Sequence, residues 1–303
     1  MTSTTESASV VAIWNPVSGS APDEAELRAA LDGGVALVET TEDDPGPGQT
    51  ADAVAAGART VVVCGGDGTV RACLDAVAHS GTALDVVPLG TGNLLAVNLG
   101  IPPGLESADE VGSHPTRSID VGYVNDEAFV VMAGTGFDAL MIRDADSTAK
   151  SRFGTAAYVI SALRHLRRPL EPVTVTVDGR PWFAGRTSMV LVGNHGTMSG
   201  GIEVFPDAAA DDGRLDVAVL AARRLRDWVG VFARLVVGRP QSSDLVRVTQ
   251  GSEIVVTNRR PRPYELDGEP RPPTSRLRFT VDPGALLVHD RLASTAIEPG
   301  ADQ

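Results

Sequence analysis

Short apolar runs alternate with longer amphipathic segments over the first hundred residues of the chain. Continuous apolar runs bounded by turn residues are typical of buried strands, and apolar residues spaced three or four apart are typical of helices. The predicted strands are 10–14, 35–38, 60–64 and 84–87. The predicted helices run from 22 to the Gly33-Gly34 pair, from 49 to 56, from 69 to 79, and from the loop at 88–93 to Gly100. Four strand–helix units in succession predict an α/β domain with a parallel sheet and helices on both faces.

The pattern changes after residue 117, where strand-like segments follow one another through tight turns. Asn125-Asp126 and Asp178-Gly179 are the turn signals, and an Asp-Gly pair between two strand-like runs predicts a hairpin. Two helices, near 155–166 and 225–237, interrupt this region. Together, the strand-like segments and tight turns after residue 117 predict a mainly antiparallel β-sandwich. Its predicted strands are 173–177, 181–184, 187–192, 215–220, 252–257, 276–281 and 285–288.

The length of 303 residues fits two domains. We expect the α/β domain to occupy residues 1–120 and the β-sandwich residues 121–288. The C-terminal tail, 289–303, is a candidate to return to the first domain. The two ends, 1–8 and 294–303, are expected to be disordered.

The net charge of −13 argues against a polyanionic partner, because affinity for nucleic acid depends on neutralising phosphates. Aromatic residues make up only 4% of the chain, which leaves few platforms for stacking bases. We therefore expect no nucleic-acid partner. One local basic patch follows the helical stretch 155–163, and a solvated helix end is its favoured interpretation. That patch consists of Arg164, His165, Arg167 and Arg168.

No apolar run reaches the eighteen residues that a membrane-spanning helix needs. The first nine residues lack the basic start and apolar core of an export signal. We therefore expect a cytoplasmic protein. The two cysteines, Cys64 and Cys73, fall on a predicted buried strand and a predicted buried helix face, so both are interpreted as structural thiols.

Two familiar routes to phosphoryl transfer are excluded because the sequence lacks their motifs. Lys150 is the only lysine, and no glycine precedes it in the spacing of a Walker A loop. The His-Arg-Asp and Asp-Phe-Gly motifs of protein kinases are also missing from the sequence.

The segment Gly65–Thr69 reads Gly-Gly-Asp-Gly-Thr and lies between the apolar run 60–64 and an amphipathic helix. Three glycines allow backbone N–H groups to close on a ligand, and the helix directs its positive N-terminus at the same point. Asp67 could hold a cation there. We expect Thr69 to cap the helix. The alternative is an ordinary tight turn, but the combination favours phosphate with a divalent metal.

Two further loops follow predicted strands of the same sheet, Asn15–Gly19 and Gly90–Asn93. The carboxyl ends of parallel strands meet at one edge of a sheet, where ligands of α/β proteins bind. The joint glycine and hydroxyl content of the three loops therefore predicts a nucleotide site.

Taken in order, the motifs of this chain resemble those of the diacylglycerol kinase catalytic-domain family, bacterial lipid kinases related to sphingosine kinases. The resemblance implies an N-terminal nucleotide domain, a C-terminal β-sandwich and ATP bound in the cleft between them. The motifs are Asn15–Gly19, Gly65–Thr69, Gly90–Asn93, Leu99–Pro102, Gly134–Ala139, Pro206–Ala208, Asp211–Asp216 and Asp267–Glu269.

The resemblance also implies roles for particular residues. Glu269 becomes the general base, and Asp67 a ligand of the catalytic Mg²⁺, with a base role for Asp67 left open. A structural Mg²⁺ is implied at Asp212 and the backbone carbonyls of Ala209 and Arg214, although an ordinary Asp-Asp-Gly turn would fit the sequence equally well. The residues expected to contact ATP are Asn15, Thr41 (or its neighbour Thr40), Gly65, Gly66, Asp67, Gly68, Thr69, Val70, Arg71, Thr91 and Asn93.

The implied reaction transfers the γ-phosphoryl group of Mg-ATP to a lipid hydroxyl, diacylglycerol or a related lipid alcohol, at the inner membrane surface. A homodimer is left open. Many members of the family carry Asp after the Gly-Thr-x-Asn motif, where this chain has Leu94, and this puts the choice of lipid in doubt. Two other functions remain: a nucleotide-binding, lipid-sensing pseudokinase, and an NAD kinase. The second is disfavoured because the sequence contains no Asn-Glu pair.

Overall fold

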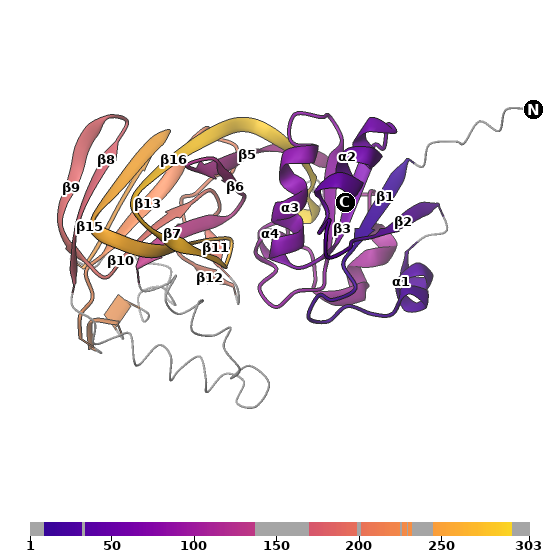
Figure 1. The fold of residues 1–303 in the computed structure, drawn as a ribbon, viewed down its shortest axis with the longest axis horizontal. Coiled ribbons are helices and arrows are strands. Elements are labelled where there is room, and N and C mark those ends of the chain that lie inside the picture. Colours follow the sequence, from indigo (N-terminus) through magenta and orange to yellow (C-terminus); the bar gives the residue numbers. More distant parts are fainter. Residues whose placement is uncertain are drawn as a thin grey trace, which may run out of the picture. The chain divides into compact units, whose positions relative to one another are not determined.

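The computed structural model describes residues 9–31, 34–136, 170–198, 201–224, 226–228, 230–231 and 245–292 (Figure 1). The chain forms two compact units. The α/β unit combines Met1–Ile119 with Gly284–Gln303, and the β unit comprises Asp120–Pro283. The chain passes between the units within β5 (Thr116–Val124) and again within β16 (Glu269–His289).

The α/β unit is built on parallel strands in the order β4-β3-β1-β2. The end of β16 adds to this sheet beside β4, in parallel, at Val288 and Leu84. This confirms the prediction of a parallel α/β domain. The elements are β1 (Val10–Trp14), α1 (Glu24–Ala30), β2 (Val35–Glu39), α2 (Pro47–Ala55), β3 (Thr60–Gly65), α3 (Asp67–Val77), β4 (Ala83–Pro88), α4 (Leu94–Asn98) and the 3₁₀ helix η1 (Gly104–Glu110).

Helices cover both faces of this sheet because its strands are apolar on both sides. On one face Trp14 and Val62 pack with Leu27 of α1 and Ala108 of η1. The alternate residues, such as Ile13 and Val61, are also fully buried and face the other side. There α2 and α3 contact each other and the strands β1 and β3.

The start of α3 differs from the prediction. The helix begins at Asp67 rather than at Thr69, and Gly66 is its N-cap without a side-chain capping bond. Thr69 is buried in the first turn, where its Oγ1 accepts a hydrogen bond from Asn15. The prediction that Thr69 caps the helix is therefore wrong, because the hydroxyl takes a partner from another loop.

The β unit is antiparallel, as predicted, with the strand order β14-β13-β10-β7-β15-β16. The hairpins β5–β6 and β8–β9 turn at Asn125 and at Asp178-Gly179, as their sequences predict. The strands not yet given are β6 (Glu127–Phe129), β7 (Met132–Gly136), β8 (Glu171–Val177), β9 (Arg180–Thr187), β10 (Met189–Gly193), β11 (Thr197–Met198), β12 (Ile202–Glu203), β13 (Leu215–Leu220), β14 (Val246–Gly251) and β15 (Glu253–Leu266).

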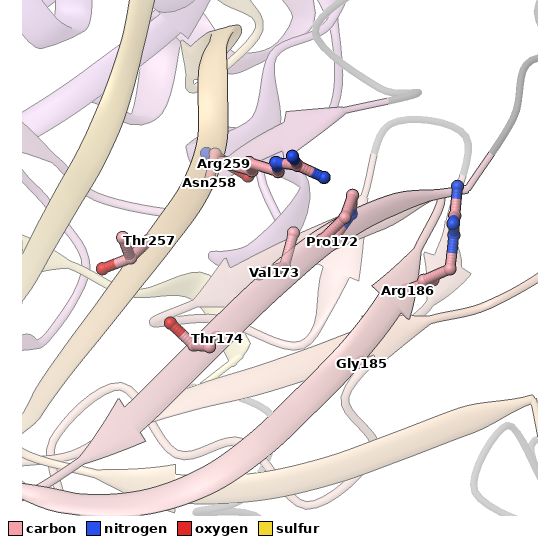
Figure 2. A pocket seen from close by; sticks show the side chains of 8 residues that line it. All are labelled: Pro172, Val173, Thr174, Gly185, Arg186, Thr257, Asn258 and Arg259. Atoms are coloured by element: carbon pink, nitrogen blue, oxygen red, sulfur yellow. The ribbon is translucent and has the colours of Figure 1, made fainter.

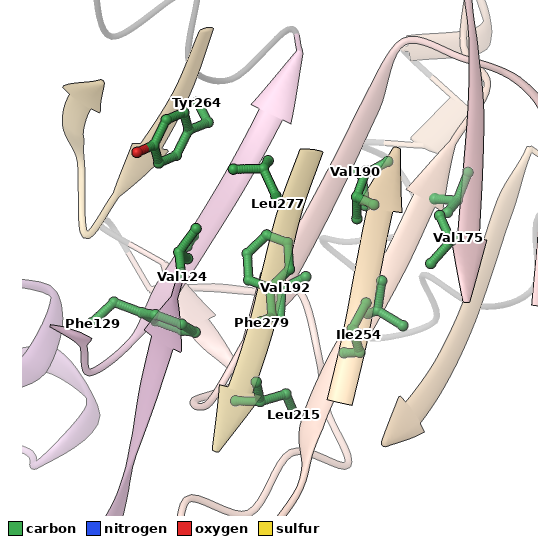
Figure 3. Close-up of a cluster of buried hydrophobic side chains, with 14 of the residues drawn as sticks. Val124, Phe129, Val175, Val190, Val192, Leu215, Ile254, Tyr264, Leu277 and Phe279 are labelled. Atoms are coloured by element: carbon green, nitrogen blue, oxygen red, sulfur yellow. The ribbon is translucent and has the colours of Figure 1, made fainter. Parts of the chain in front are cut away.

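Alternate residues of these strands form one apolar core in the β unit (Figure 3). Phe129 and Phe279 meet edge to face, with ring centroids 6.5 Å apart. Val192, Leu215 and Ile254 surround them from three different strands. The core therefore ties β6, β10, β13, β15 and β16 into one body.

Several parts of the sequence prediction fall outside the described residues, among them the two ends, 1–8 and 294–303. The helix predicted near 155–166 and the basic patch that follows it lie there entirely, and the helix predicted at 225–237 lies there for the most part. Within the described part of the chain, every helix is too short or too polar to cross a bilayer.

Candidate functional site

Three loops of the α/β unit meet at the carboxyl ends of β1, β3 and β4. The backbone N–H and Oγ of Ser20 both donate to the carbonyl of Leu89, at 3.0 and 2.9 Å. The N–H of Leu89 in turn donates to the carbonyl of Gly65, at 2.9 Å. Hydrogen bonds therefore join the loop after β1, the loop after β4 and the end of β3 in one structure.

The loops after β3 and β4 approach each other so closely that their facing residues must be glycines. A Cβ on Gly90 would lie 2.6 Å from the Cα of Gly66, and a Cβ on Gly66 would lie 3.1 Å from the Cα of Gly90. Gly65 is equally restricted, since a Cβ added at this position would lie 2.7 Å from Oγ1 of Thr69. The close approach of the two loops therefore requires glycine at these positions, and the polar groups of the backbone stay accessible to a ligand.

Asn15 connects the loop after β1 to the first turn of α3. Its Nδ2 donates to Oγ1 of Thr69 at 3.0 Å, and its Oδ1 accepts the N–H of Val17 at 3.1 Å. Both groups of the amide are thus used to shape the loop. The structure brings Asn15 and Thr69 together, and in this arrangement they support the glycine loop.

Asn93 closes the loop after β4. Its backbone is in the left-handed region, with φ of 48°, which asparagine tolerates better than most residues. Its Oδ1 accepts the N–H of Gly90 at 2.9 Å, and its Nδ2 donates to the Gly90 carbonyl at 3.0 Å. The next residue, Leu94, donates its N–H to Oδ1 of Asp67 at 2.6 Å. Asp67 therefore holds the two glycine loops together.

The surface that these loops present suits a phosphate group. Gly66, Asp67 and Gly68 are partly exposed, and Thr91 is exposed. The helix α3 runs for eleven residues from Asp67, so its first backbone N–H groups point out of this surface with the positive end of the dipole. Val70 is buried one turn into the helix, so only its backbone faces the first turn. Arg71, partly exposed, is the cation nearest in sequence.

The loop after β2 lies beside α3. A Cβ on Gly46 would lie 2.9 Å from Sγ of Cys73. Thr41 is exposed on this loop, and its Oγ1 accepts the N–H of Asp44 at 3.1 Å. Thr40 is buried, with its N–H bound to the carbonyl of Trp14. Exposure favours Thr41 over Thr40 as a residue that a ligand could reach.

Both cysteines are buried thiols without a disulfide. Burial raises the pKa of Cys64 far above its usual value, with a further contribution from Asp85. Burial also raises the pKa of Cys73 to about 11, although a hydrogen bond with Thr50 opposes the shift. Thiols with raised pKa values are poor nucleophiles, which agrees with a structural role.

In the β unit, Glu269 is the first residue of β16 and pairs with Leu266 across the Asp267-Gly268 turn. Its side chain is about one-third exposed, and its Oε2 lies 3.3 Å from a terminal nitrogen of Arg271. The Nε of Arg271 donates to Oε2 of Glu127 at 2.6 Å. The guanidinium therefore lies between two carboxylates and orients that of Glu269.

Asp267 is a residue whose role the sequence analysis missed. Its carboxylate is buried and accepts three backbone N–H groups, from Val130 at 2.8 Å and from Val131 and Met132 at 2.9 Å each. These bonds fix the turn that carries Glu269 against the segment before β7. An aspartate in an Asp-Gly hairpin is common in any exposed turn, so only the long-range bonds reveal this function.

The Asp-Asp-Gly segment forms a loop before β13. Oδ1 of Asp212 accepts the N–H of Arg214 at 2.9 Å, and Oδ2 of Asp120 accepts the N–H of Gly213 at 2.7 Å. Burial raises the pKa of Asp216 to about 6, and the charges of Asp212 and Asp207 add to the shift. The loop therefore carries an excess of negative charge around exposed oxygen ligands.

These oxygens fit a hard cation such as Mg²⁺. Asp212 and Ala209 are exposed, as the proposed carboxylate and carbonyl ligands require. Within the described residues no three His, Cys, Asp or Glu side chains converge on one point, so a metal here would depend on backbone carbonyls. The Gly134–Ala139 motif is described only as far as Gly136.

Comparison with known proteins decides the family. Residues 9–124 match the model of the diacylglycerol kinase catalytic domain, and residues 131–290 match that of the YegS C-terminal NAD kinase beta sandwich-like domain. A probable lipid kinase YegS-like from Pseudomonas fluorescens is 33% identical over 241 residues, 78% of this chain and 79% of that protein. The chain belongs to the diacylglycerol kinase and YegS-like lipid kinase family. A diacylglycerol kinase of Bacillus subtilis is 30% identical over 215 residues, 69% of this chain and 70% of that protein.

Solved structures support the fold of the family. A diacylglycerol kinase from Bacillus anthracis superposes with a TM-score of 0.77 at 22% identity, covering 96% of this chain and 99% of that one. An NAD kinase from Archaeoglobus fulgidus in complex with ATP superposes with a TM-score of 0.53 at 12% identity, covering 95% and 96% of the two chains. The family and fold predicted from the sequence motifs are thus confirmed, and with them the assignment to ATP-dependent kinases.

Proposed function

We propose that this protein transfers the γ-phosphoryl group of Mg-ATP to the hydroxyl of diacylglycerol or a related lipid alcohol, and so produces a phospholipid. One observation carries the proposal. A chain of this kinase family keeps the glycine loops after β3 and β4 in contact, joined by the bond from Leu94 to Asp67.

The glycine loops would hold the triphosphate. Backbone N–H groups at the start of α3 and the hydroxyl of Thr91 would bind phosphate oxygens, with Arg71 nearby as a cation. Asn15, Thr69 and Asn93 would keep the loops in shape, as their hydrogen bonds already do. The Mg²⁺ ion would neutralise charge on the phosphates.

Glu269 would act as the general base. Its carboxylate is partly exposed and oriented by Arg271, so it could accept the proton of a lipid hydroxyl as the oxygen attacks phosphorus. Asp267 would position it, because its buried carboxylate fixes the turn. The exposed oxygens of Ala209, Asp212 and Arg214 would bind a second, structural Mg²⁺ that neutralises the charge near Asp216.

We further propose that the enzyme works at the inner surface of the membrane, where its lipid substrate resides. The supporting argument is the chemistry of the acceptor, since a diacyl lipid stays in the bilayer and the kinase must come to it.

The test is transfer of labelled γ-phosphate from Mg-ATP into a total lipid extract, with NAD as a parallel acceptor. A labelled phospholipid or lysophospholipid is the expected product, and its structure names the acceptor. Label in NAD alone would establish an NAD kinase instead. ATP binding with no label in either acceptor would favour a lipid-sensing pseudokinase.

A further inference from the structure

Segment 130–132, which leads into β7, is bound by hydrogen bonds from two sides. On one side the carboxylate of Asp267 accepts its three backbone N–H groups. On the other side the backbone N–H of Asn194, the residue after β10, donates to the carbonyl of Val131 at 2.9 Å. The turn that carries Glu269 is therefore connected to the end of β10 through this segment.

The side chain of Asn194 makes a second connection. The residue is 1% exposed, and its Nδ2 donates to the carbonyls of Val130 at 3.0 Å and Asp120 at 2.8 Å. Because both partners are carbonyl oxygens, the group that faces them must be the NH₂ of the amide. The Oδ1 is buried and has no hydrogen-bond partner among the described residues, which costs free energy. The value of this asparagine therefore lies in its two donor bonds.

Asp120 holds the Asp-Asp-Gly loop on both sides of Asp212. Its backbone N–H donates to the carbonyl of Ala210 at 2.6 Å, and its Oδ2 accepts the N–H of Gly213 at 2.7 Å. Asp120 is itself only 1% exposed, so water has little access to replace these bonds. The loop that carries the proposed cation ligands is thus fixed to the same residue as the amide of Asn194.

We propose that Asn194 is a positioning residue that couples the Asp-Asp-Gly loop to the turn of Glu269. The loop is bound to Asp120, and Asp120 is bound to the amide of Asn194. That amide also binds segment 130–132, which Asp267 joins to the turn. All these groups belong to the β unit, and β13, β10, β7 and β15 are successive neighbours in its sheet. A divalent cation on the loop would therefore limit the motion of the turn.

The role of Glu269 as a base rests on the proposed function, but the coupling can be measured without nucleotide or turnover. The measurement is amide hydrogen exchange with and without Mg²⁺, followed by mass spectrometry. Peptides that cover 206–216 and 264–271 report on the loop and on the turn. In the wild type we expect Mg²⁺ to slow exchange in both peptides. In Asp212→Asn, which lacks the proposed carboxylate ligand, both effects should be lost.

In Asn194→Leu, Mg²⁺ should still protect the loop and should no longer protect the turn. Asn194→Ala removes the same amide without an added branched side chain, and should give the same result. It serves as the second variant if leucine does not fit at this buried position.

Two control variants separate the coupling from general effects of changing a buried polar group. Asn258→Leu removes another amide of the β unit, which is 3% exposed on β15 and lines a cavity (Figure 2). This amide has no hydrogen-bond partner among the described residues. Thr187→Val removes a buried hydroxyl that donates to the carbonyl of Leu220, at the opposite end of β10 from Asn194. Both controls should keep the Mg²⁺ protection of the turn.

Turnover gives a second measurement of the same coupling. We expect kcat to fall about tenfold in Asn194→Leu, because the base is less well placed, and to stay within about twofold in the two controls. The affinity for ATP should be unchanged, since the glycine loops belong to the α/β unit.

Two exchange results would overturn the proposal: protection of the turn that persists in both Asn194 variants, and protection confined to the loop in the wild type. Absence of protection in both peptides of the wild type would overturn it as well, because no cation would then bind the loop. A wild type that transfers no label to lipid would instead refute the proposed function, and the exchange results would still decide whether loop and turn are coupled.

Discussion

The carboxylate of Asp67 accepts the backbone N–H of Leu94 at 2.6 Å, although 27 positions separate the two residues. Leu94 is the first residue of α4, and the N-cap Asn93 makes no side-chain capping bond of its own. Asp67 therefore caps α4 from another loop. This hydrogen bond joins the two glycine loops without a metal ion, so Asp67 has a structural role that is separate from any role in binding Mg²⁺.

This relationship predicts a different pattern of effects for two variants of Asp67. Asp67→Ala removes the acceptor and should lower the free energy of unfolding by about 1 kcal/mol, the usual effect of losing a capping bond. Asp67→Asn keeps an Oδ1 acceptor and should lower it by less. Kinase activity should be lost in both if the carboxylate also binds Mg²⁺. Near-normal activity in Asp67→Asn would limit this residue to its structural role.

The contact between Gly66 and Gly90 predicts that neither position tolerates a side chain. In Gly90→Ala the new Cβ would overlap the Cα of Gly66, so the loops must separate. We expect the affinity for ATP to fall about tenfold or more, with a stability loss of about 1–3 kcal/mol. Gly34→Ala is the control, because no heavy atom lies within 4 Å of its added Cβ. An unchanged ATP affinity in Gly90→Ala, measured by calorimetry, would show that nucleotide binding does not need the two loops in contact.

Asp267 should matter for the stability of the β unit more than its place in an Asp-Gly turn suggests. Asp267→Asn replaces one acceptor oxygen by an NH₂ group that faces backbone N–H donors. We expect a loss of about 3 kcal/mol in the free energy of unfolding, measured by denaturant titration. Asp126→Asn, in the exposed turn between β5 and β6, should change stability by less than about 0.5 kcal/mol. Similar effects of the two changes would show that the buried bonds contribute little.

Asp85 should make the stability of the protein depend on pH. Burial raises the pKa of its carboxyl above the usual range, while hydrogen bonds from Gly112 and Val86 and the charges of His289 and Arg291 oppose the shift. The folded state therefore keeps the proton to a higher pH than the unfolded chain does. Asp85 therefore contributes its full amount to the free energy of unfolding at pH values below the usual carboxyl pKa. This contribution is lost as the pH rises through the pKa of the folded state.

Asp85→Asn removes this titration. The free energy of unfolding of the wild type should fall relative to that of Asp85→Asn as pH rises above the usual carboxyl range. Chemical unfolding of both proteins across that range measures the difference. A constant difference at all pH values would show that the pKa of Asp85 is not raised.

The sequence predicts those strands and turns that are specified by the residues within the segment itself. The runs at 10–14 and 60–64, apolar except for Thr60, form β1 and β3, and the Asp178-Gly179 pair forms a hairpin turn. The predicted break between strands 276–281 and 285–288 was wrong, because β16 continues through Gly284 at a φ of +64° as the chain changes units. Local sequence at Pro283-Gly284 is typical of a turn, and only pairing at both ends shows that the strand continues.

The same distinction applies to the site. The glycine loops were recognisable because their composition and order along the chain are unusual. The partners of Thr69, Asp67 and Asp267 were not predictable, since each bonds to a residue more than twenty positions away. Thr69 is an example: its hydroxyl is suited to capping a helix, but in the structure it accepts a hydrogen bond from Asn15 of another loop.

The proposed mechanism depends above all on Glu269, which accepts the proton of the lipid hydroxyl during transfer from Mg-ATP. The deciding experiment compares Glu269→Gln with the matched variant Glu127→Gln, and measures turnover of the lipid acceptor and ATP affinity in each. Both glutamates contact Arg271, so both changes remove an ion pair from the same guanidinium. We predict a fall in kcat of about 10²-fold or more in Glu269→Gln, the range for loss of a general base, with ATP affinity retained. Glu127→Gln should keep most of its turnover. Equal activity in the two variants, or a Glu269→Gln enzyme that works at the wild-type rate, would contradict the mechanism.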